Sequence, residues 1–120
     1  MVDDISFGTH YLVDLKDCDP EPIKRVEPTR AILLRAVNDC GATLVNECFH
    51  QYEPFGVSGV VLIAESHFSV HTWPEHGFVG VDIFTCGEMD AEVAIDVMRN
   101  AFQAQEIQVK TLVRGLLGQE

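Results

Sequence analysis

The sequence predicts an α+β fold, a two-layer sandwich in which an antiparallel sheet carries two helices on one face. Segments with strand-like alternation and segments with helical periodicity follow one another in the order β-α-β-β-β-β-α-β. The four consecutive strand-like segments are separated by gaps of hairpin length, which favours antiparallel neighbours. The chain has 120 residues, so we expect one domain, 1–120, with a core of its own.

The first half of the chain supplies a strand and a helix. A strand is expected at 7–14, ahead of a break that is rich in proline. A helix is predicted at 28–40, because apolar residues recur on one face and Gly41 stands where a C-terminal cap belongs. Four short strands follow, each bounded by glycine or proline. They are 43–52, 57–64, 68–73 and 78–85.

The last two elements complete the two layers. Asp90 is placed to cap a second helix over 91–102, whose apolar residues recur at helical spacing, and a final strand is expected at 107–113. Two helices on one face leave the other face of the sheet uncovered. A dimer that covers this face is therefore expected.

The amino-acid composition limits the kinds of molecule that the chain is expected to bind. The net charge is −11, from 19 acidic and 8 basic residues, so nucleic acids and anionic membranes are poor partners and a cationic small molecule is a better one. The acidic N-terminus and the lack of a long apolar run predict a cytoplasmic protein without a membrane segment. The four widely spaced cysteines are then expected to be reduced thiols.

Reactive side chains gather between residues 65 and 86, and three kinds of site can be built from them. A zinc site would use His67, His71, His76 and Cys86, but their spacing matches no structural zinc pattern. A hydrolase triad would use Ser66, His71 and Asp82, but the G-x-S-x-G turn is missing around Ser66.

The third possibility is a serine that cleaves its own backbone. Ser66 stands at a predicted turn between strands, and His71 follows five residues later. A hydroxyl in such a turn can attack the preceding carbonyl, and a base can then remove the serine α-proton and break the chain. Elimination leaves dehydroalanine, which hydrolyses to a pyruvoyl group. Residue spacing alone does not choose among the three.

A longer stretch carries a resemblance to a known family. The segment GVSGVVLIAESHFSVHTWPEHGFVGVDIFTCG, from Gly56 to Gly87, resembles the signature of the prokaryotic S-adenosylmethionine decarboxylase proenzymes. The blocks ESH, HTWPE and FTCG occur in the family's order, and the similarity extends outward over nearly the whole chain. The resemblance implies a pyruvoyl-dependent decarboxylase with a two-layer fold that forms a homodimer, with its sites near the interface and no metal.

The resemblance also implies roles for the residues in these blocks. The scissile bond is Glu65-Ser66, which divides the precursor into a β chain, 1–65, and an α chain, 66–120, whose covalent pyruvoyl cofactor derives from Ser66. His71 is the base of the elimination, and Ser58 assists the same step. Cys86 returns a proton to the substrate after CO₂ leaves.

Substrate-binding positions are implied in the same way. Phe49 resembles the aromatic residue that stacks on adenine, with His71 on the other side of the base. Glu75 resembles the carboxylate that binds the ribose hydroxyls, and Glu65 is also placed among the substrate-binding residues. The expected substrate is S-adenosylmethionine, whose decarboxylated product is the aminopropyl donor for spermidine.

Two alternatives remain at this point. Some relatives use the same pyruvoyl group on arginine or ornithine. A non-catalytic or metal-binding module on the same fold is the alternative from another class.

Overall fold

The computed structural model describes residues 6–115. Within this range the chain forms six strands, two α-helices and two short 3-10 helices. In chain order the elements are β1 (Gly8–Lys16), η1 (Glu21–Ile23), α1 (Val26–Asp39), β2 (Leu44–Gln51), β3 (Val57–Ile63), β4 (Ser66–Trp73), η2 (Pro74–His76), β5 (Phe78–Thr85), α2 (Ala91–Ala101) and β6 (Glu106–Arg114).

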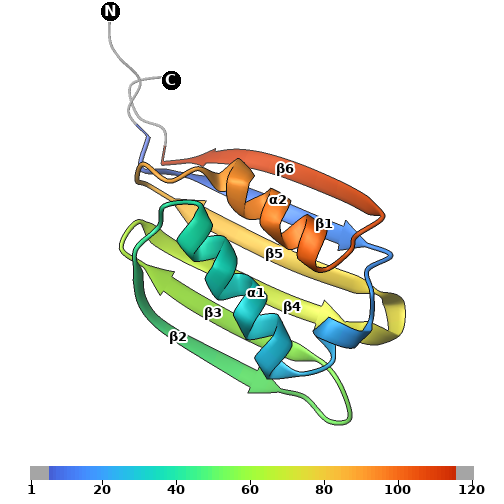
Figure 1. Ribbon diagram of the computed structural model, residues 1–120. Coiled ribbons are helices and arrows are strands. Elements are labelled where there is room, and N and C mark those ends of the chain that lie inside the picture. Colours follow the sequence, from blue (N-terminus) through green and yellow to red (C-terminus); the bar gives the residue numbers. More distant parts are fainter. Residues whose placement is uncertain (1–5, 116–120) are drawn as a thin grey trace, which may run out of the picture.

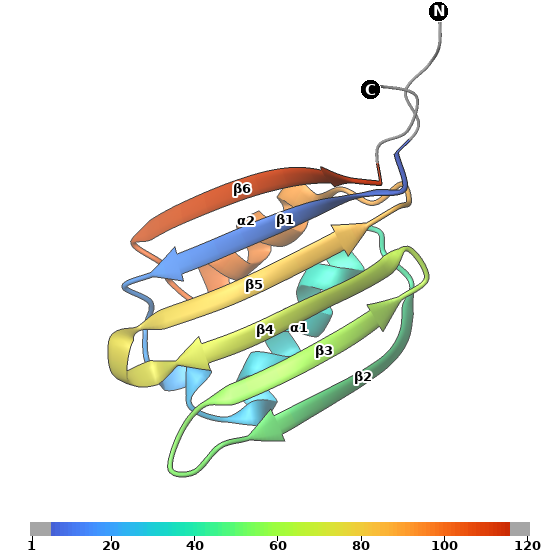
Figure 2. The same cartoon turned by 180° about the vertical axis from the view of Figure 1, so that it is seen from behind.

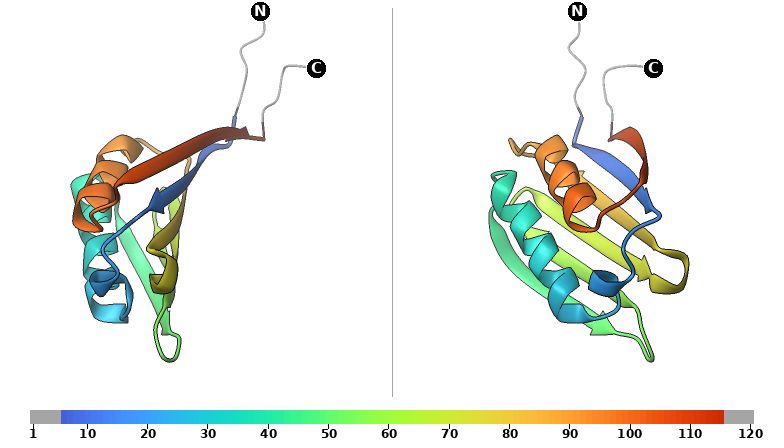
Figure 3. Two further views of the ribbon diagram at one scale, coloured as in Figure 1. Left: turned by 90° about the vertical axis from the view of Figure 1, so that its right-hand side faces the viewer. Right: turned by 45° about the vertical axis from the view of Figure 1, so that its right-hand side comes forward.

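The strands form one sheet in the order β2-β3-β4-β5-β1-β6, and all neighbouring strands are antiparallel. Both helices cover the same face (Figure 1). The opposite face, seen in Figure 2, carries no helix, and the edge view in Figure 3 shows the two layers. The predicted two-layer α+β fold is therefore confirmed. No helix among residues 6–115 combines the length and the apolar character needed to cross a membrane.

The core lies between the sheet and the two helices. Every second side chain of the central strands points into it. In β4, Phe68 and Val70 are buried against the helices, whereas Ser69 between them points to the other face. Leu33 from α1 and Met98 from α2 are fully buried against the same strands. Burial of each such side chain contributes about 1.5–3 kcal/mol.

The ends of the helices follow the predicted capping residues. The Asp90 carboxylate accepts hydrogen bonds from two backbone amides in the first turn of α2. Gly41 follows α1 with φ of 84°, a conformation that glycine adopts without strain. The bounds differ from prediction mainly at β4, which begins at Ser66 rather than at residue 68. The earlier start places Ser66 within the sheet ladder.

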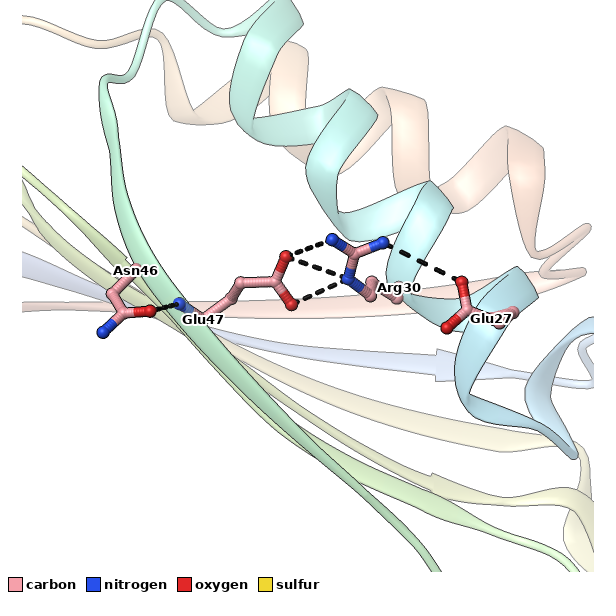
Figure 4. Close-up of polar contacts among 4 residues, drawn as sticks. All are labelled: Glu27, Arg30, Asn46 and Glu47. Carbon is pink, nitrogen blue, oxygen red and sulfur yellow. Dashed lines mark hydrogen bonds and ion pairs between the residues drawn. The ribbon is translucent and has the colours of Figure 1, made fainter.

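A pair of charged residues joins α1 to the edge strand β2. The Arg30 Nε atom donates to both carboxylate oxygens of Glu47, at 2.7 and 2.9 Å, and Arg30 also lies near Glu27 (Figure 4). The hydrogen bond from Arg30 lowers the pKa of the Glu47 carboxyl below its ordinary value. The bidentate geometry fixes the edge of the sheet relative to the helix layer.

The face without helices, which we call the open face, exposes several large apolar side chains among polar ones. Val60, Leu62, Trp73 and Leu112 point to it by strand alternation, and each is at least 42% exposed. Exposed apolar side chains gathered on one face of a sheet make that face a candidate interaction surface.

Candidate functional site

The open face carries the histidines and the tryptophan of β4. His67, His71 and Trp73 alternate with the buried Phe68 and Val70, as the sequence predicts. The candidate site residues of β4 and the neighbouring segments form two clusters. The turn cluster consists of Glu65, Ser66 and Cys86, and the pocket cluster of Ser58, His71 and Glu75.

The turn cluster is built at the hairpin between β3 and β4. Ala64 and Glu65 form a two-residue turn, and Ser66 opens β4 with φ of 148°. This backbone region is essentially restricted to glycine and costs another residue on the order of 1–3 kcal/mol. The Ser66 Oγ atom lies 3.4 Å from Nδ1 of His67. Strain is thus located at the residue that follows the Glu65-Ser66 peptide bond.

Cys86 binds the carbonyl of that same peptide bond. Its backbone N–H donates to the Glu65 carbonyl oxygen at 2.9 Å, and its thiol donates to the same oxygen at 3.2 Å. Two donors aimed at one carbonyl oxygen polarise the carbonyl and stabilise negative charge that develops on it. The Glu65 carbonyl carbon is therefore prepared for attack by a nucleophile.

The Glu65 side chain contacts the loop that precedes β2. Its carboxylate accepts hydrogen bonds from the backbone N–H of Thr43 at 3.1 Å and from the Thr43 hydroxyl at 3.4 Å. The carboxylate is thus engaged within the fold, and the substrate-binding role of Glu65 stays a prediction.

The pocket cluster lies farther along the sheet. Ser58 Oγ and His71 Nδ1 are 2.8 Å apart across the β3–β4 ladder, and this contact orients the imidazole. Both residues line a pocket of about 330 Å³. The complete lining is Tyr52, Phe55, Gly56, Ser58, His71, Thr72, Trp73 and Glu75.

The loop between β2 and β3 supplies the aromatic wall of this pocket. The side-chain amide of Gln51 donates to the carbonyl oxygens of Lys24 at 2.9 Å and Gly56 at 3.1 Å, which holds the loop against the start of α1. The Lys24 ammonium lies 4.9 Å from the ring centroid of Phe55. Tyr52 and Phe55 are 48% and 46% exposed, so their rings are available to a ligand.

Within one chain, the structure does not place Phe49 beside His71, where the two were expected to stack on adenine. Phe49 pairs with Gly59, and its ring occupies the space that a side chain at Gly59 would fill. Gly59 points toward the helices, and Phe49 packs against the core there. Phe49 and His71 therefore lie on opposite faces of the sheet. The aromatic residues that line the pocket with His71 are Trp73, Tyr52 and Phe55. Sequence reasoning missed Tyr52 and Phe55, which stand on either side of Glu53-Pro54.

The two clusters lie far apart within one chain. Ser66 and His71 are separated by five positions along β4, and a strand rises about 3.3 Å per residue, so they are roughly 16 Å apart. The expectation that His71 serves Ser66 because it follows closely in sequence fails within a single chain.

The residues of the other two predicted sites, the zinc site and the hydrolase triad, do not come together in the described residues. No three His, Cys, Asp or Glu side chains in the described part of the chain are grouped to hold a metal ion. The carboxylate of Asp82 accepts a hydrogen bond from Ser69 at 3.0 Å and lies 3.5 Å from His10, so it does not complete a triad with Ser66 and His71.

The cysteines fall into two groups. Cys48 and Cys86 are exposed, whereas Cys18 and Cys40 are buried. Burial raises the pKa of the Cys18 thiol to about 11, with a further contribution from Asp17, and burial also raises the pKa of Cys40. Within the two clusters, Cys86 is therefore the accessible thiol beside a reactive group.

Comparison with known proteins identifies the family. Residues 9–115 match the S-adenosylmethionine decarboxylase family. The S-adenosylmethionine decarboxylase proenzyme of Thermodesulfovibrio yellowstonii is 44% identical over 113 residues, which cover 93% of this chain and 84% of that protein. The proenzyme of Pyrococcus abyssi is 42% identical over 112 residues, which cover 92% of this chain and 81% of that protein.

A solved structure is similar over almost its full length. The crystal structure of the adenosylmethionine decarboxylase from Aquifex aeolicus has a TM-score of 0.86 and 39% sequence identity, with 96% of each chain covered. The resemblance predicted from the ESH, HTWPE and FTCG blocks is confirmed. The chain belongs to the S-adenosylmethionine decarboxylase proenzyme family and is an enzyme of this kind.

Proposed function

We propose that the chain cleaves itself between Glu65 and Ser66 and that the processed enzyme decarboxylates S-adenosylmethionine. The observation that carries the proposal is the turn cluster. A strained serine follows a carbonyl whose oxygen accepts two hydrogen bonds from Cys86. This is the arrangement that attack of a serine hydroxyl on its own preceding peptide bond requires.

The proposed cleavage proceeds through an ester and an elimination. The Ser66 oxygen bonds to the Glu65 carbonyl carbon, the C–N bond breaks, and the hydroxyl proton ends on the freed Ser66 nitrogen, which gives an ester. A base then removes the Ser66 α-proton, and the bond from Cβ to the ester oxygen breaks. Glu65 leaves as a carboxylate, and Ser66 becomes dehydroalanine. Water replaces its nitrogen, ammonia departs, and a pyruvoyl group remains.

His71 is the proposed base, and its position supports a homodimer. Within one chain its ring is roughly 16 Å from Ser66, well beyond the reach of direct proton transfer. A second copy packed against the open face can bring its own His71 to the turn cluster. Ser58 then assists by holding the imidazole through the 2.8 Å contact to Nδ1.

The residues of the turn cluster fit a pyruvoyl group. Ser66 is the source of the group. The accessible thiol of Cys86 donates a hydrogen bond to the carbonyl oxygen of Glu65, the residue directly before Ser66. The group supplies an electron-withdrawing carbonyl that accepts the electron pair left by departing CO₂. Cys86 is the proposed donor of the proton that then replaces CO₂ on the substrate carbon.

The pocket cluster is the proposed nucleoside site. Tyr52 and Phe55 offer rings for stacking, and Glu75 offers a carboxylate to the ribose hydroxyls. Aromatic rings also attract a sulfonium, and the net charge of −11 draws a cationic substrate toward the protein. A pocket with two exposed aromatic rings favours the adenosyl substrate over arginine or ornithine. The product would supply an aminopropyl group for spermidine.

Two measurements test the proposal. Intact mass should show chains of residues 1–65 and 66–120, and a Ser66→Ala variant should stay whole. The processed protein should release labelled CO₂ from carboxyl-labelled S-adenosylmethionine and not from labelled arginine or ornithine. A wild-type chain that stays whole would overturn the cleavage, and release from arginine alone would overturn the substrate.

A further inference from the structure

We infer that the Glu65 side chain, anchored on Thr43, positions the scissile bond for self-cleavage. This inference rests on the proposed cleavage and adds a role for the loop between α1 and β2. Thr43 lies outside both clusters, and its contacts are to Glu65 and Ala64 rather than to the reacting atoms. Its role would be that of a positioning residue.

The strained backbone at Ser66 needs support from outside the turn. A non-glycine residue with φ of 148° persists only where the surrounding structure holds it. A two-residue hairpin turn has few contacts of its own, so the restraint has to come from neighbouring segments. The turn therefore needs anchors outside β3 and β4.

Two neighbouring loops provide these anchors, and both act on Glu65. On one side, Thr43 donates two hydrogen bonds to the Glu65 carboxylate, and its own carbonyl accepts a 2.9 Å bond from the N–H of Ala64. On the other side, Cys86 donates to the Glu65 carbonyl. With the side chain and the carbonyl both held, rotation about the Cα–C bond of Glu65 is restricted.

Gly87 makes room for this arrangement. A Cβ atom at position 87 would lie 2.4 Å from Cγ and 2.9 Å from Cβ of Glu65, closer than real contacts allow. The loop after β5 thus accepts the Glu65 side chain because residue 87 has none. The Thr43 loop is also fixed to the rest of the fold, because the N–H of Asp90 donates to the carbonyl of Cys40 at 3.0 Å.

The consequence concerns the first chemical step. The acyl shift requires the Glu65 carbonyl carbon to face the Ser66 hydroxyl, and the elimination that follows does not depend on the Glu65 side chain. Loss of the carboxylate should therefore slow ester formation specifically. Small displacements of reacting atoms can change rates by large factors.

The experiment follows cleavage of freshly translated precursor on a denaturing gel, with and without hydroxylamine, which cuts esters but leaves amides intact. Glu65→Ala should cleave at least about tenfold more slowly than the wild type, because a charge-assisted contact is lost. Glu65→Gln, which keeps an oxygen acceptor for the Thr43 N–H, should recover most of the rate. Hydroxylamine should not rescue Glu65→Ala, whereas it should cut the ester that accumulates in His71→Ala.

Matched variants separate positioning from folding. Glu88→Ala removes an exposed carboxylate from the neighbouring loop and should cleave at the wild-type rate. Thr43→Ala should slow cleavage and Thr43→Ser should restore it, with unchanged melting temperatures for both. Cleavage of Glu65→Ala at the wild-type rate, or its rescue by hydroxylamine, would overturn the inference while leaving self-cleavage intact. A wild-type chain that never cleaves would refute the self-cleavage and the inference together.

Discussion

We propose that His71 of one protomer is the base that removes the Ser66 α-proton of the other. If so, two variants that are each inactive alone should cleave when they form a mixed dimer. The perturbation is a mixture of His71→Ala and Ser66→Ala chains. The separation of roughly 16 Å within one chain exceeds the approximately 3 Å reach of proton transfer several-fold. A His71→Ala chain alone should therefore stop at the uncut or ester stage.

In the mixed dimer one complete site is formed, from Ser66 of the first chain and His71 of the second. Random pairing of equal amounts places about half of the His71→Ala chains in such dimers, so about half of them should be cut. The two chains are unfolded and refolded together, and intact mass identifies which chain is cleaved. Each variant refolded alone is the control. If no His71→Ala chain is cut in the mixture, the shared site is refuted. If His71→Ala cleaves normally alone, His71 is not the base.

Three further predictions concern the pocket and the stability of the fold. Tyr52→Ala should raise KM for S-adenosylmethionine by roughly two- to tenfold through lost stacking, whereas Phe49→Leu should lower the melting temperature and leave KM unchanged. Arg30 lowers the pKa of Glu47 in the folded state, so the pair stabilises the fold above the ordinary carboxyl pKa of about 4.3. This stabilisation is lost as the pH falls through the lowered pKa of Glu47 in the folded protein. Glu47→Gln removes this contribution, so its melting temperature should decline less steeply as the pH is lowered. Asp90→Ala should cost about 1 kcal/mol in urea unfolding through loss of the cap of α2.

The elements that the sequence predicts well are those whose local pattern agrees with their tertiary role. β5 alternates strictly because one face is core and the other is open, and its predicted bounds, 78–85, match the structure. Asp90 is recognisable because a carboxylate before an amphipathic segment caps a helix wherever it is packed. At these positions the local sequence pattern and the tertiary packing favour the same secondary structure.

Phe49 shows where such reasoning stops. The register of β2 shifts between Leu44 and Asn46, so the face of each later residue cannot be counted from the start of the strand. The decisive fact is the cross-strand partner, since Gly59 leaves a space on the helix side that the Phe49 ring fills. A partner on another strand is not visible in the sequence of β2 alone. Tyr52, in the loop, has no periodicity that would reveal its orientation.

The distance between the two clusters has a further consequence for how the protein matures. Two sheets that pack face to face lie about 10 Å apart, so a two-fold related copy on the open face can present its pocket cluster to the turn cluster of the first chain. A two-fold interface is reciprocal, so the same contact completes the second site. The strain at Ser66 and the donors on the Glu65 carbonyl are already present in one chain, whereas the proposed base is not. Ester formation should then proceed in the monomer, and the elimination that breaks the chain should wait for assembly. Dilution of fresh precursor should accumulate the hydroxylamine-sensitive ester, and concentration should release it as cleaved chains.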